Sequence, residues 1–222
     1  MILALAATEI EMSPLQTLLQ EGGFPCLTLV TGAGPVETAA RLAGFLASSS
    51  AKIGLAVNFG VAGGYIFDTC GEGPGLLDLY LAETEAFGDL GICFPDRIEP
   101  LAEALTGKLL FSLDRGLLDQ ARRICMENNV IVKTGNFVTV SGVSATRHRG
   151  EMLRSRFHAH CENMEGAAIA RVCAEYALPL LEIRCISNLV EDRDLRHWRL
   201  REACVKSARS AAEIIKNIAE PL

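Results

Sequence analysis

The amino-acid sequence predicts an α/β fold, a single-domain three-layer sandwich in which helices flank a mixed, largely buried central sheet. Short apolar runs that suit buried strands alternate along the chain with longer segments of helical periodicity. Of the 222 residues, 50% are hydrophobic and 22% are charged, so the chain can enclose one core without disulfides or metals. No repeat, Ser/Pro-rich linker or shift of composition divides residues 1–222, which we therefore expect to form one domain.

The expected strands are short apolar runs, most of them bounded by glycine, proline or polar residues. They lie at residues 2–7, 26–30, 53–59, 77–84, 130–133, 137–143 and 180–186. The glycines of residues 60–64 then follow the third strand as a loop. Residues 65–100 contain several glycines and prolines, and we expect loops there together with an extension of the sheet.

The expected helices begin at capping residues or prolines and carry apolar side chains at helical spacing. They run from Pro14 to about residue 20, from Pro35 onward, and over residues 116–128, 146–155, 162–176 and 197–219. Ser13 is the expected N-cap of the first helix. The inward stripe of the second helix is expected at Val36, Ala39, Ala40, Ala43 and Leu46.

The charge of the chain argues against a nucleic-acid-binding protein. It carries 21 Lys and Arg residues against 27 Asp and Glu residues, a formal net charge of −6, whereas phosphate backbones are bound by basic surfaces. Most of the arginines fall within residues 147–209. They either lie on solvated helix faces or face an anionic group of a small substrate.

The eight cysteines form no CxxC pair, and several lie in apolar runs, as reduced buried thiols do. His158, His160 and Cys161 are ligand-type residues, but no second pair at metal-site spacing accompanies them, so no metal site is expected. The longest uncharged runs, residues 22–36 and 53–67, are too short to span a membrane. The N-terminus has no basic segment of a signal peptide, so we expect a cytoplasmic location.

Segments that directly follow strands are the first candidates for a ligand site, because ligands bind beyond the carboxyl ends of strands in such sheets. Those segments are residues 8–11, 31–34, 58–64, 162–165 and 187–188. Residues 31–34 are not a dinucleotide fingerprint, since Glu37 replaces its third glycine. The chain also contains no P-loop and no GxSxG elbow.

What these segments offer is carboxylates and amides. Glu9 and Glu11 follow the first strand, where an acid either stabilises a helix N-terminus or takes part in catalysis. Glu165 precedes an Ala-rich helix, where it is either a plain first-turn acid or a ligand of a sugar diol. The positions alone do not choose between these readings.

Four segments in order, residues 31–36, 58–64, 163–168 and 183–188, together resemble the superfamily of purine nucleoside phosphorylases and nucleosidases. Within it, the chain is most similar to the futalosine hydrolases. The residues that carry this closer likeness are 139–146, 162–168, Ser187-Asn188, Arg193-Asp194 and Trp198. The related methylthioadenosine/adenosylhomocysteine nucleosidases usually carry Ser-Gly-Asp-x-Phe in place of residues 141–145 and Asp in place of Asn188.

The resemblance implies a nucleoside phosphorylase-like fold and hydrolysis of the N-glycosidic bond of futalosine. The products would be hypoxanthine and dehypoxanthinyl futalosine, in the menaquinone pathway. It implies no organic cofactor and no metal, a small-molecule nucleoside as the partner instead of nucleic acid or a membrane, and a homo-oligomer, a dimer or tetramer. Because futalosine carries a benzoate, Arg147, Arg149 or Arg193 is expected to bind its carboxylate.

The resemblance also implies site residues. Glu11 matches the water-activating carboxylate, with Glu9 as the alternative, and Arg184 matches a residue that keeps this carboxylate ionised. Glu165 matches the acid that binds the ribose hydroxyls, and Met164 packs beneath the sugar. The remaining expected substrate contacts are Asn163, Gly63, Gly34, Ser187 and Thr146.

Asn188 is the position that distinguishes the purine. A protonated Asp suits a 6-amino group, whereas an Asn amide offers one donor and one acceptor to the 6-oxo edge of hypoxanthine. Asn cannot release a proton, so the source of the N7 proton stays open. Three other functions are possible: a nucleosidase for methylthioadenosine, adenosylhomocysteine or aminodeoxyfutalosine, a phosphorylase, and a non-catalytic nucleoside-binding protein. A phosphorylase is disfavoured because residues 31–34 and 58–64 contain no Arg or Lys.

Overall fold

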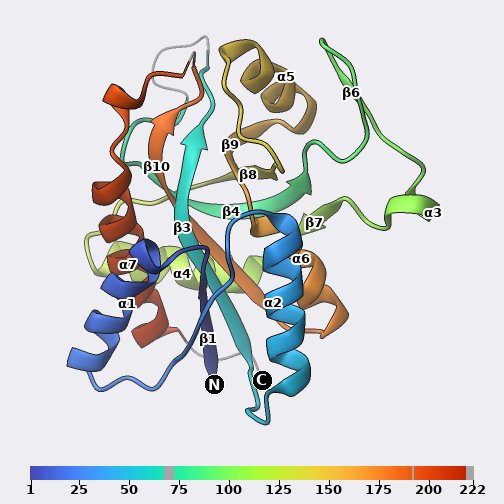
Figure 1. Ribbon diagram of the computed structural model, residues 1–222. Coiled ribbons are helices and arrows are strands. Elements are labelled where there is room, and N and C mark those ends of the chain that lie inside the picture. The colour runs from blue at the N-terminus through green and yellow to red at the C-terminus, as the bar shows by residue number, and fades with distance from the viewer. Residues whose placement is uncertain (68–72, 192, 219–222) are drawn as a thin grey trace.

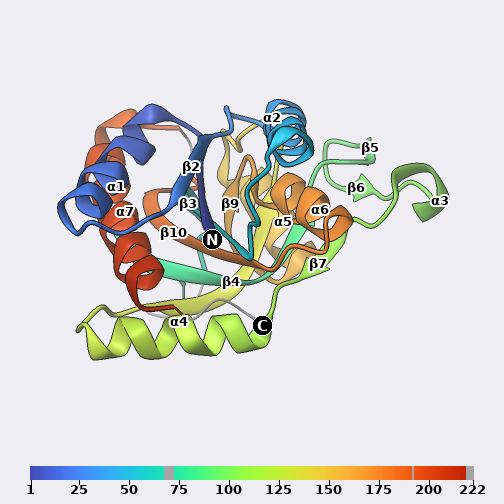
Figure 2. The ribbon, with the colours of Figure 1, turned by 90° about the horizontal axis from the view of Figure 1, so that it is seen from below.

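Helices cover both faces of a twisted central sheet in the computed structural model, which describes residues 1–67, 73–191 and 193–218 (Figure 1). On one side lie α1, α4 and α7, and on the other α2 and α6 (Figure 2). The predicted three-layer α/β sandwich is therefore confirmed. The helices are α1 (Glu9–Glu21), α2 (Pro35–Ser48), α3 (Glu103–Thr106), α4 (Arg115–Glu127), α5 (Arg147–Phe157), α6 (Gly166–Glu175) and α7 (Leu200–Asn217), with a 3-10 turn at Leu195–His197.

The sheet is mixed, as predicted. Strands β1, β2, β3 and β10 run parallel to one another, while β4 runs antiparallel to β10 and β9 antiparallel to β3. Because β10 pairs with both β4 and β3, this part of the sheet closes on itself. The strands are β1 (Ile2–Ala6), β2 (Leu27–Val30), β3 (Leu55–Gly64), β4 (Leu79–Phe87), β7 (Leu110–Ser112), β8 (Lys133–Thr139), β9 (Ala159–Asn163) and β10 (Leu180–Leu189).

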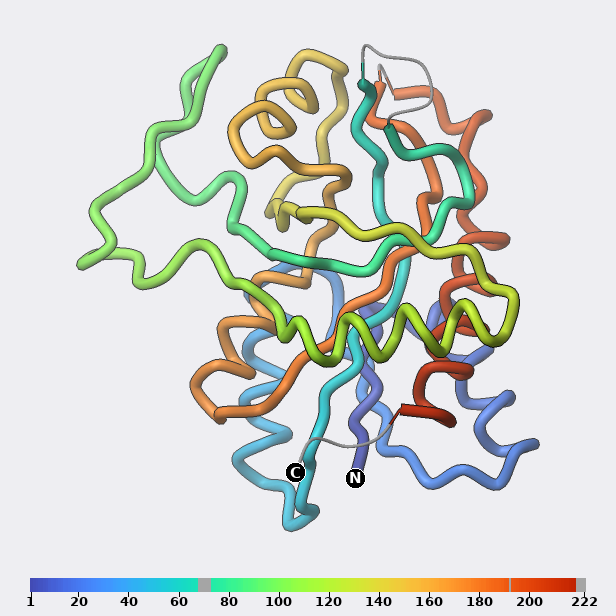
Figure 3. The backbone as a smooth tube through the Cα atoms, turned by 180° about the vertical axis from the view of Figure 1, so that it is seen from behind, coloured from blue at the N-terminus to red at the C-terminus, as the bar shows by residue number. Residues whose placement is uncertain are grey.

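Alternating side chains of the strands divide the core between the two faces. Ala4 and Val57 belong to the cluster beneath α1, α4 and α7, whereas Leu5 and Ala56 belong to the cluster beneath α2 and α6. Both faces of these strands are thus buried, as their nearly unbroken apolar sequences require. Figure 3 shows the molecule from behind, with α4 crossing in front of the sheet. The hairpin β5 (Ile92–Cys93) and β6 (Ile98–Glu99), together with α3, projects away from the sandwich (Figure 2).

The predicted start of the first helix is wrong. Helix α1 begins at Glu9, and Pro14 lies inside it. Thr8 is the N-cap: its backbone and side chain both bond to Glu11, three residues on, in a capping box. This reciprocal pairing satisfies donors at the helix N-terminus better than Ser13 does five residues later.

The predicted inward stripe of α2 is also wrong in part. Val36 is 82% exposed and Ala40 is exposed, whereas Thr38 and Leu42 are buried. The hydroxyl of Thr38 donates to the carbonyl oxygen of Gly32 at 3.0 Å, which turns this face of the helix toward the sheet. A buried threonine with a backbone partner thus takes the place that the apolar pattern gave to valine.

Several predicted strand boundaries differ from the structure. Residues 60–64, expected as a loop, are the end of β3, and the strands expected at 130–133 and 137–143 are the single strand β8. The strands β9 and β7 were not predicted, because AHCEN is largely polar and LFS is only three residues long. The predicted end of the last helix, residue 219, lies outside the described residues; α7 ends at Asn217.

Candidate active site

Glu11 is turned into the protein by the capping box at the start of α1. Its Oε2 accepts hydrogen bonds from the N–H and the hydroxyl of Thr8, at 3.0 and 2.7 Å, and its Oε1 accepts from the N–H of Val61 at 3.1 Å. Glu11 is only 4% exposed, whereas Glu9 is exposed to solvent. Of the two acids left open by the sequence, the structure therefore places Glu11 at the end of β3.

Gly60 explains how Glu11 and Arg184 reach the same place. A Cβ on Gly60 would lie 2.5 Å from Oε1 of Glu11 and 2.9 Å from Nη1 of Arg184, closer than side-chain atoms pack. The missing side chain leaves the space into which both charged groups extend. The glycine-rich residues 60–64 therefore continue β3, and side chains from neighbouring elements pack directly on their backbone.

Glu165 lies at the N-cap of α6 and connects two loops. Its Oε1 accepts from the N–H of Gly34 at 3.2 Å, and its Oε2 accepts from Nη1 of Arg184 at 3.3 Å. Gly34 has a φ of 90°, a conformation that favours glycine. Burial raises the pKa of Glu165, while Arg184 and the Gly34 N–H act in the opposite direction.

Arg184 is the cation at the centre of this cluster and is 1% exposed. Its Nε donates to Glu182 at 2.8 Å, its Nη1 to the carbonyl oxygen of Val61 at 3.2 Å, and its Nη2 to Oδ1 of Asn163 at 3.4 Å. Burial lowers the pKa of Arg184, but the charges of Glu182, Glu165 and Glu11 outweigh it and raise the pKa above its ordinary value. The guanidinium is therefore a permanent charge, fixed by at least four acceptors.

Asn163 caps the start of α6. Its Oδ1 accepts from the N–H groups of Glu165 and Gly166, at 2.8 and 2.7 Å, so it satisfies the free donors at the helix start. Met164 lies between Asn163 and Glu165 and is half-buried. The backbone that carries Met164 and Glu165 is thus fixed by an amide side chain.

Ser187 and Asn188 form a second polar pair at the end of β10. The hydroxyl of Ser187 donates to Oδ1 of Asn188 at 2.9 Å, and Nδ2 of Asn188 donates to the carbonyl oxygen of Leu189 at 3.2 Å. The register against β3 shifts at this point, so that Asn188 pairs with Gly63. A Cβ on Gly63 would lie 3.4 Å from Nδ2 of Asn188. The bulge and the glycine together aim this amide.

Thr146 has a capping role. It is the N-cap of α5, its hydroxyl accepts from the N–H of Arg149 at 3.3 Å, and it is exposed. Within the described part of the chain, no hydrogen bond links it to Glu165, Arg184 or Asn188. Its expected contact with a substrate stays a prediction.

Glu85 and Glu182 lie in the same polar cluster and were missed by the sequence analysis. Both are fully buried, on β4 and β10. The signal that indicates them is an acid within an apolar strand, in the sequences LYLAETEAF and LLEIRCISNL, because an isolated buried charge is too costly to occur without a partner.

The metal ligands considered from the sequence do not converge. Across residues 1–67, 73–191 and 193–218, no group of three or more His, Cys, Asp or Glu residues is arranged to hold a metal ion. The ring of His160 lies against Phe67 and Tyr80. In the same residues, no helix is long and apolar enough to cross a membrane.

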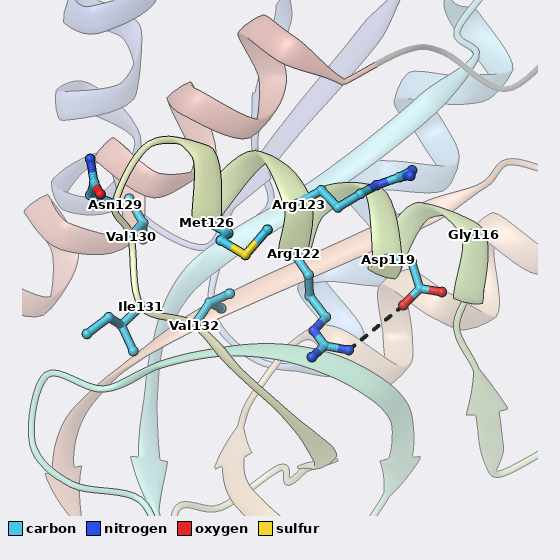
Figure 4. Close-up of a pocket in the computed structure, with 9 residues that line it drawn as sticks. All are labelled: Gly116, Asp119, Arg122, Arg123, Met126, Asn129, Val130, Ile131 and Val132. Atoms are coloured by element: carbon cyan, nitrogen blue, oxygen red, sulfur yellow. Dashed lines mark ion pairs between the residues drawn. The ribbon is translucent and has the colours of Figure 1, made fainter.

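A cavity of about 980 Å³ lies elsewhere, along α4 and the segment that follows it (Figure 4). Met126 and Ile131 are 72% and 85% exposed there, and Arg122 pairs with Asp119. None of the acids or amides described above lines this cavity. It is a hollow on the protein surface, separate from the polar cluster.

The fold is a three-layer α/β sandwich whose buried acids and arginine gather toward the ends of its strands. The chain belongs to the phosphorylase superfamily, whose sequence model matches residues 15–220. It is 33% identical over 219 residues to futalosine hydrolase of Thermus thermophilus, covering 95% of this chain and 91% of that protein. It is 30% identical to futalosine hydrolase of Streptomyces coelicolor, covering 79% and 72% of the two chains.

Solved structures confirm the fold. Native futalosine hydrolase of Helicobacter pylori strain 26695 superposes with a TM-score of 0.84 at 19% identity, over 98% of this chain and 97% of that chain. The methylthioadenosine/adenosylhomocysteine nucleosidase of Neisseria meningitidis, in complex with methylthio-immucillin-A, has a TM-score of 0.82 at 22% identity, over 98% and 99%. The family model and the 33% identical relative confirm the predicted resemblance to this superfamily.

Proposed function

We propose that this chain is a futalosine hydrolase, which cleaves the N-glycosidic bond of futalosine with water and releases hypoxanthine and dehypoxanthinyl futalosine. The observation that carries the proposal is the convergence of Glu11 and Glu165 on Arg184 beside Ser187-Asn188. The likeness to two proteins named futalosine hydrolase supports the substrate. The reaction belongs to menaquinone biosynthesis.

The carboxylates match the charge that develops as the bond breaks. As the purine leaves, positive charge builds on the ribose, and enzymes accelerate such a step by stabilising the transition state more than the substrate. In this proposal Glu165 accepts hydrogen bonds from the ribose hydroxyls, and Met164 packs beneath the sugar. Glu11 takes one proton from water, whose oxygen bonds to C1′, while the bond between C1′ and the purine breaks with its electron pair going to the base.

Arg184 holds the two acids in place. It donates to Glu165 and lies beside Glu11 at Gly60. Its positive charge opposes the rise in the pKa of Glu165 that burial causes. Gly34 and Asn163 support Glu165 through its side chain and its backbone N–H, respectively.

Asn188 is the proposed determinant of the purine. Ser187 occupies one lone pair of Oδ1, and Leu189 accepts one of the two Nδ2 protons. The amide retains one acceptor position and one donor, and these fit the protonated nitrogen and the 6-oxo group of hypoxanthine. Because Gly63 has no side chain, no Cβ of that residue packs against Nδ2. The proton that Glu11 accepts from the attacking water passes through water to the departing base in this scheme.

Arg193 is the proposed partner of the benzoate carboxylate. Arg147 and Arg149 already pair with Glu151 and Asp89, at 2.6 and 3.0 Å. The guanidinium of Arg193 instead lies over the ring of Trp198, 5.1 Å from its centre, and within the described part of the chain no acid pairs with it. Its backbone N–H donates to the carbonyl oxygen of Ala145 at 3.2 Å, which holds this loop against the one that follows β8.

A second candidate is an aminodeoxyfutalosine nucleosidase. One observation favours it: the chain is 28% identical to that enzyme of Helicobacter pylori strain J99, over 46% of this chain and 44% of that one. Asn188 is the proposed discriminator between the two candidates. When N7 of the departing base is protonated, a 6-oxopurine offers one donor and one acceptor to the amide, whereas a 6-aminopurine offers two donors.

Chromatography of the products tests the proposal. Purified protein is incubated with futalosine, aminodeoxyfutalosine, methylthioadenosine and inosine, each with and without phosphate. Hypoxanthine released from futalosine without phosphate supports a futalosine hydrolase. Preferred release of adenine from aminodeoxyfutalosine supports the second candidate, and a requirement for phosphate would make the enzyme a phosphorylase.

A homo-oligomer is part of the proposal. The arm formed by β5, β6 and α3 projects from the sandwich (Figure 2) and exposes apolar side chains, among them Ile92 at 48% and Leu105 at 78%. An apolar arm of this kind is typical of a surface that packs against another chain, here a second copy. Sedimentation equilibrium tests it: wild type is expected to be a dimer or larger, and a monomer at micromolar concentration overturns it.

We place the protein in the cytoplasm in this proposal. All seven cysteines in the described part of the chain carry free thiols, and Cys70 lies outside the described residues. Free thiols persist in a reducing compartment. Residues 1–222 act as one domain in this scheme, since β1 near the start and β10 near the end both pair with β3.

A further inference from the structure

Glu85 on β4 and Glu182 on β10 face each other in the interior, where neither side chain is accessible to solvent. A Cβ placed on Gly166, at the start of α6, would lie 2.0 Å from Oε1 of Glu85 and 2.7 Å from Oε2 of Glu182. Both oxygens therefore occupy the space that this glycine leaves. Two ionised carboxylates in such a place repel each other strongly, and such pairs retain a proton.

The hydrogen bonds of the two acids differ. Oε1 of Glu182 accepts from Arg184 and from Asn58, at 2.8 and 2.9 Å, whereas Oε2 of Glu182 is buried and has no partner among the described residues. Glu85 accepts from Asn163 through Oε1 and from Thr139 through Oε2. A buried acceptor without a donor is costly. A proton on Glu85 supplies the donor that Oε2 of Glu182 lacks.

We propose that Glu85 is a neutral carboxylic acid that donates its proton to Glu182, and that this acid pair positions Arg184 and Asn163 for glycosidic cleavage. The inference rests on the proposed function. The pair then carries a single negative charge, which offsets the charge of Arg184. Glu11 and Glu165 remain as the negative charges that face the developing ribose cation.

The pair fixes Glu165 from two sides. Glu182 holds Nε of Arg184, so that Nη1 points to Oε2 of Glu165. Glu85 holds Nδ2 of Asn163, so that Oδ1 accepts from the N–H of Glu165. A change at either glutamate therefore reaches Glu165 without touching substrate, which makes both of them positioning residues.

The electrostatic surroundings agree with this assignment. Burial, and then the charge of Glu182, raise the pKa of Glu85 well above its ordinary value, and burial likewise raises the pKa of Glu182. The other titratable or charged groups that face the pair come from β10, β9, the start of α6 and α6 itself. They are Arg184, Cys161, Glu165 and Cys173.

Three variants test whether Glu85 is neutral or ionised. Glu85→Gln keeps a neutral donor and acceptor, so kcat/KM for futalosine is expected to stay within about threefold of wild type. Glu85→Ala removes both groups, and Glu182→Gln removes the charge that pairs with Arg184. Both are expected to lower kcat/KM by about 100-fold or more, as the loss of a buried ionic partner does. The matched control is Glu83→Gln, an exposed acid on the same strand, which leaves kcat/KM unchanged.

Infrared difference spectroscopy reads the proton directly. At neutral pH, wild type minus Glu85→Gln is expected to show the C=O stretch of a protonated carboxyl group. This spectrum tests the pair even if futalosine proves not to be the substrate, so the two failures are distinguishable. Absence of the band, or a Glu85→Gln variant that loses as much activity as Glu182→Gln, overturns the inference.

Discussion

Gly60 offers a test of the site that alters none of its functional side chains. A methyl group there would lie 2.5 Å from Oε1 of Glu11 and 2.9 Å from Nη1 of Arg184. The first distance is about an ångström shorter than a normal van der Waals contact. Gly60→Ala therefore forces Glu11 away from the N–H of Val61, which it now contacts at 3.1 Å. Hydrogen bonds to charged groups contribute about 1.5–3 kcal/mol, so kcat/KM should fall by about 10- to 150-fold.

The assay is the release of hypoxanthine from futalosine, with thermal unfolding measured on the same samples. The matched control is Gly44→Ala, because a methyl group on Gly44 in α2 meets nothing within 4 Å. That variant should keep full activity and gain about 0.5–1 kcal/mol of stability. Full activity of Gly60→Ala would refute the placement of Glu11 and Arg184 around this glycine.

Three further predictions concern the purine, the carboxylate and pH. Asn188→Asp should lower cleavage of futalosine relative to aminodeoxyfutalosine by about tenfold or more, and equal losses of kcat/KM on both would contradict the role of Asn188. Arg193→Gln should raise KM for futalosine about tenfold with little change in kcat, whereas Arg147→Gln, the control, should not; unchanged KM in both argues against the carboxylate contact. Because the pKa of Glu85 lies above its ordinary 4.5 in the folded protein, the folded state binds more protons than the unfolded state above that pH. The free energy of unfolding should therefore fall as pH rises above 4.5, by at most about 1.4 kcal/mol per pH unit, and urea unfolding of Glu85→Gln should show a smaller slope; parallel slopes would rule the titration out.

The sequence predicted the layers, because the strands that carry the core are nearly continuous apolar runs. It failed where polar groups decide the structure. The capping box of Thr8 and Glu11 starts α1 earlier than Pro14 indicates. The strand β9 reads AHCEN because its side chains Glu162 and Asn163 bond within the protein.

The candidate site was predicted in part for the same reason. Glu11, Glu165 and Arg184 belong to motifs that the sequence displays, and the structure brings them together. Glu85 and Glu182 are acids in largely apolar strands, and this shows only that each needs a partner. Which residue that partner is depends on the pairing of β4 with β10, and strands so far apart in the sequence show no local pattern that identifies it.

Hydrolysis of futalosine is the most direct test of the proposed function. Purified protein is mixed with futalosine in phosphate-free buffer, and hypoxanthine and the residual nucleoside are quantified over time. The account predicts one equivalent of hypoxanthine for each futalosine consumed, with a rate that phosphate does not change. No hypoxanthine from a folded sample, or hypoxanthine only when phosphate is added, would contradict it.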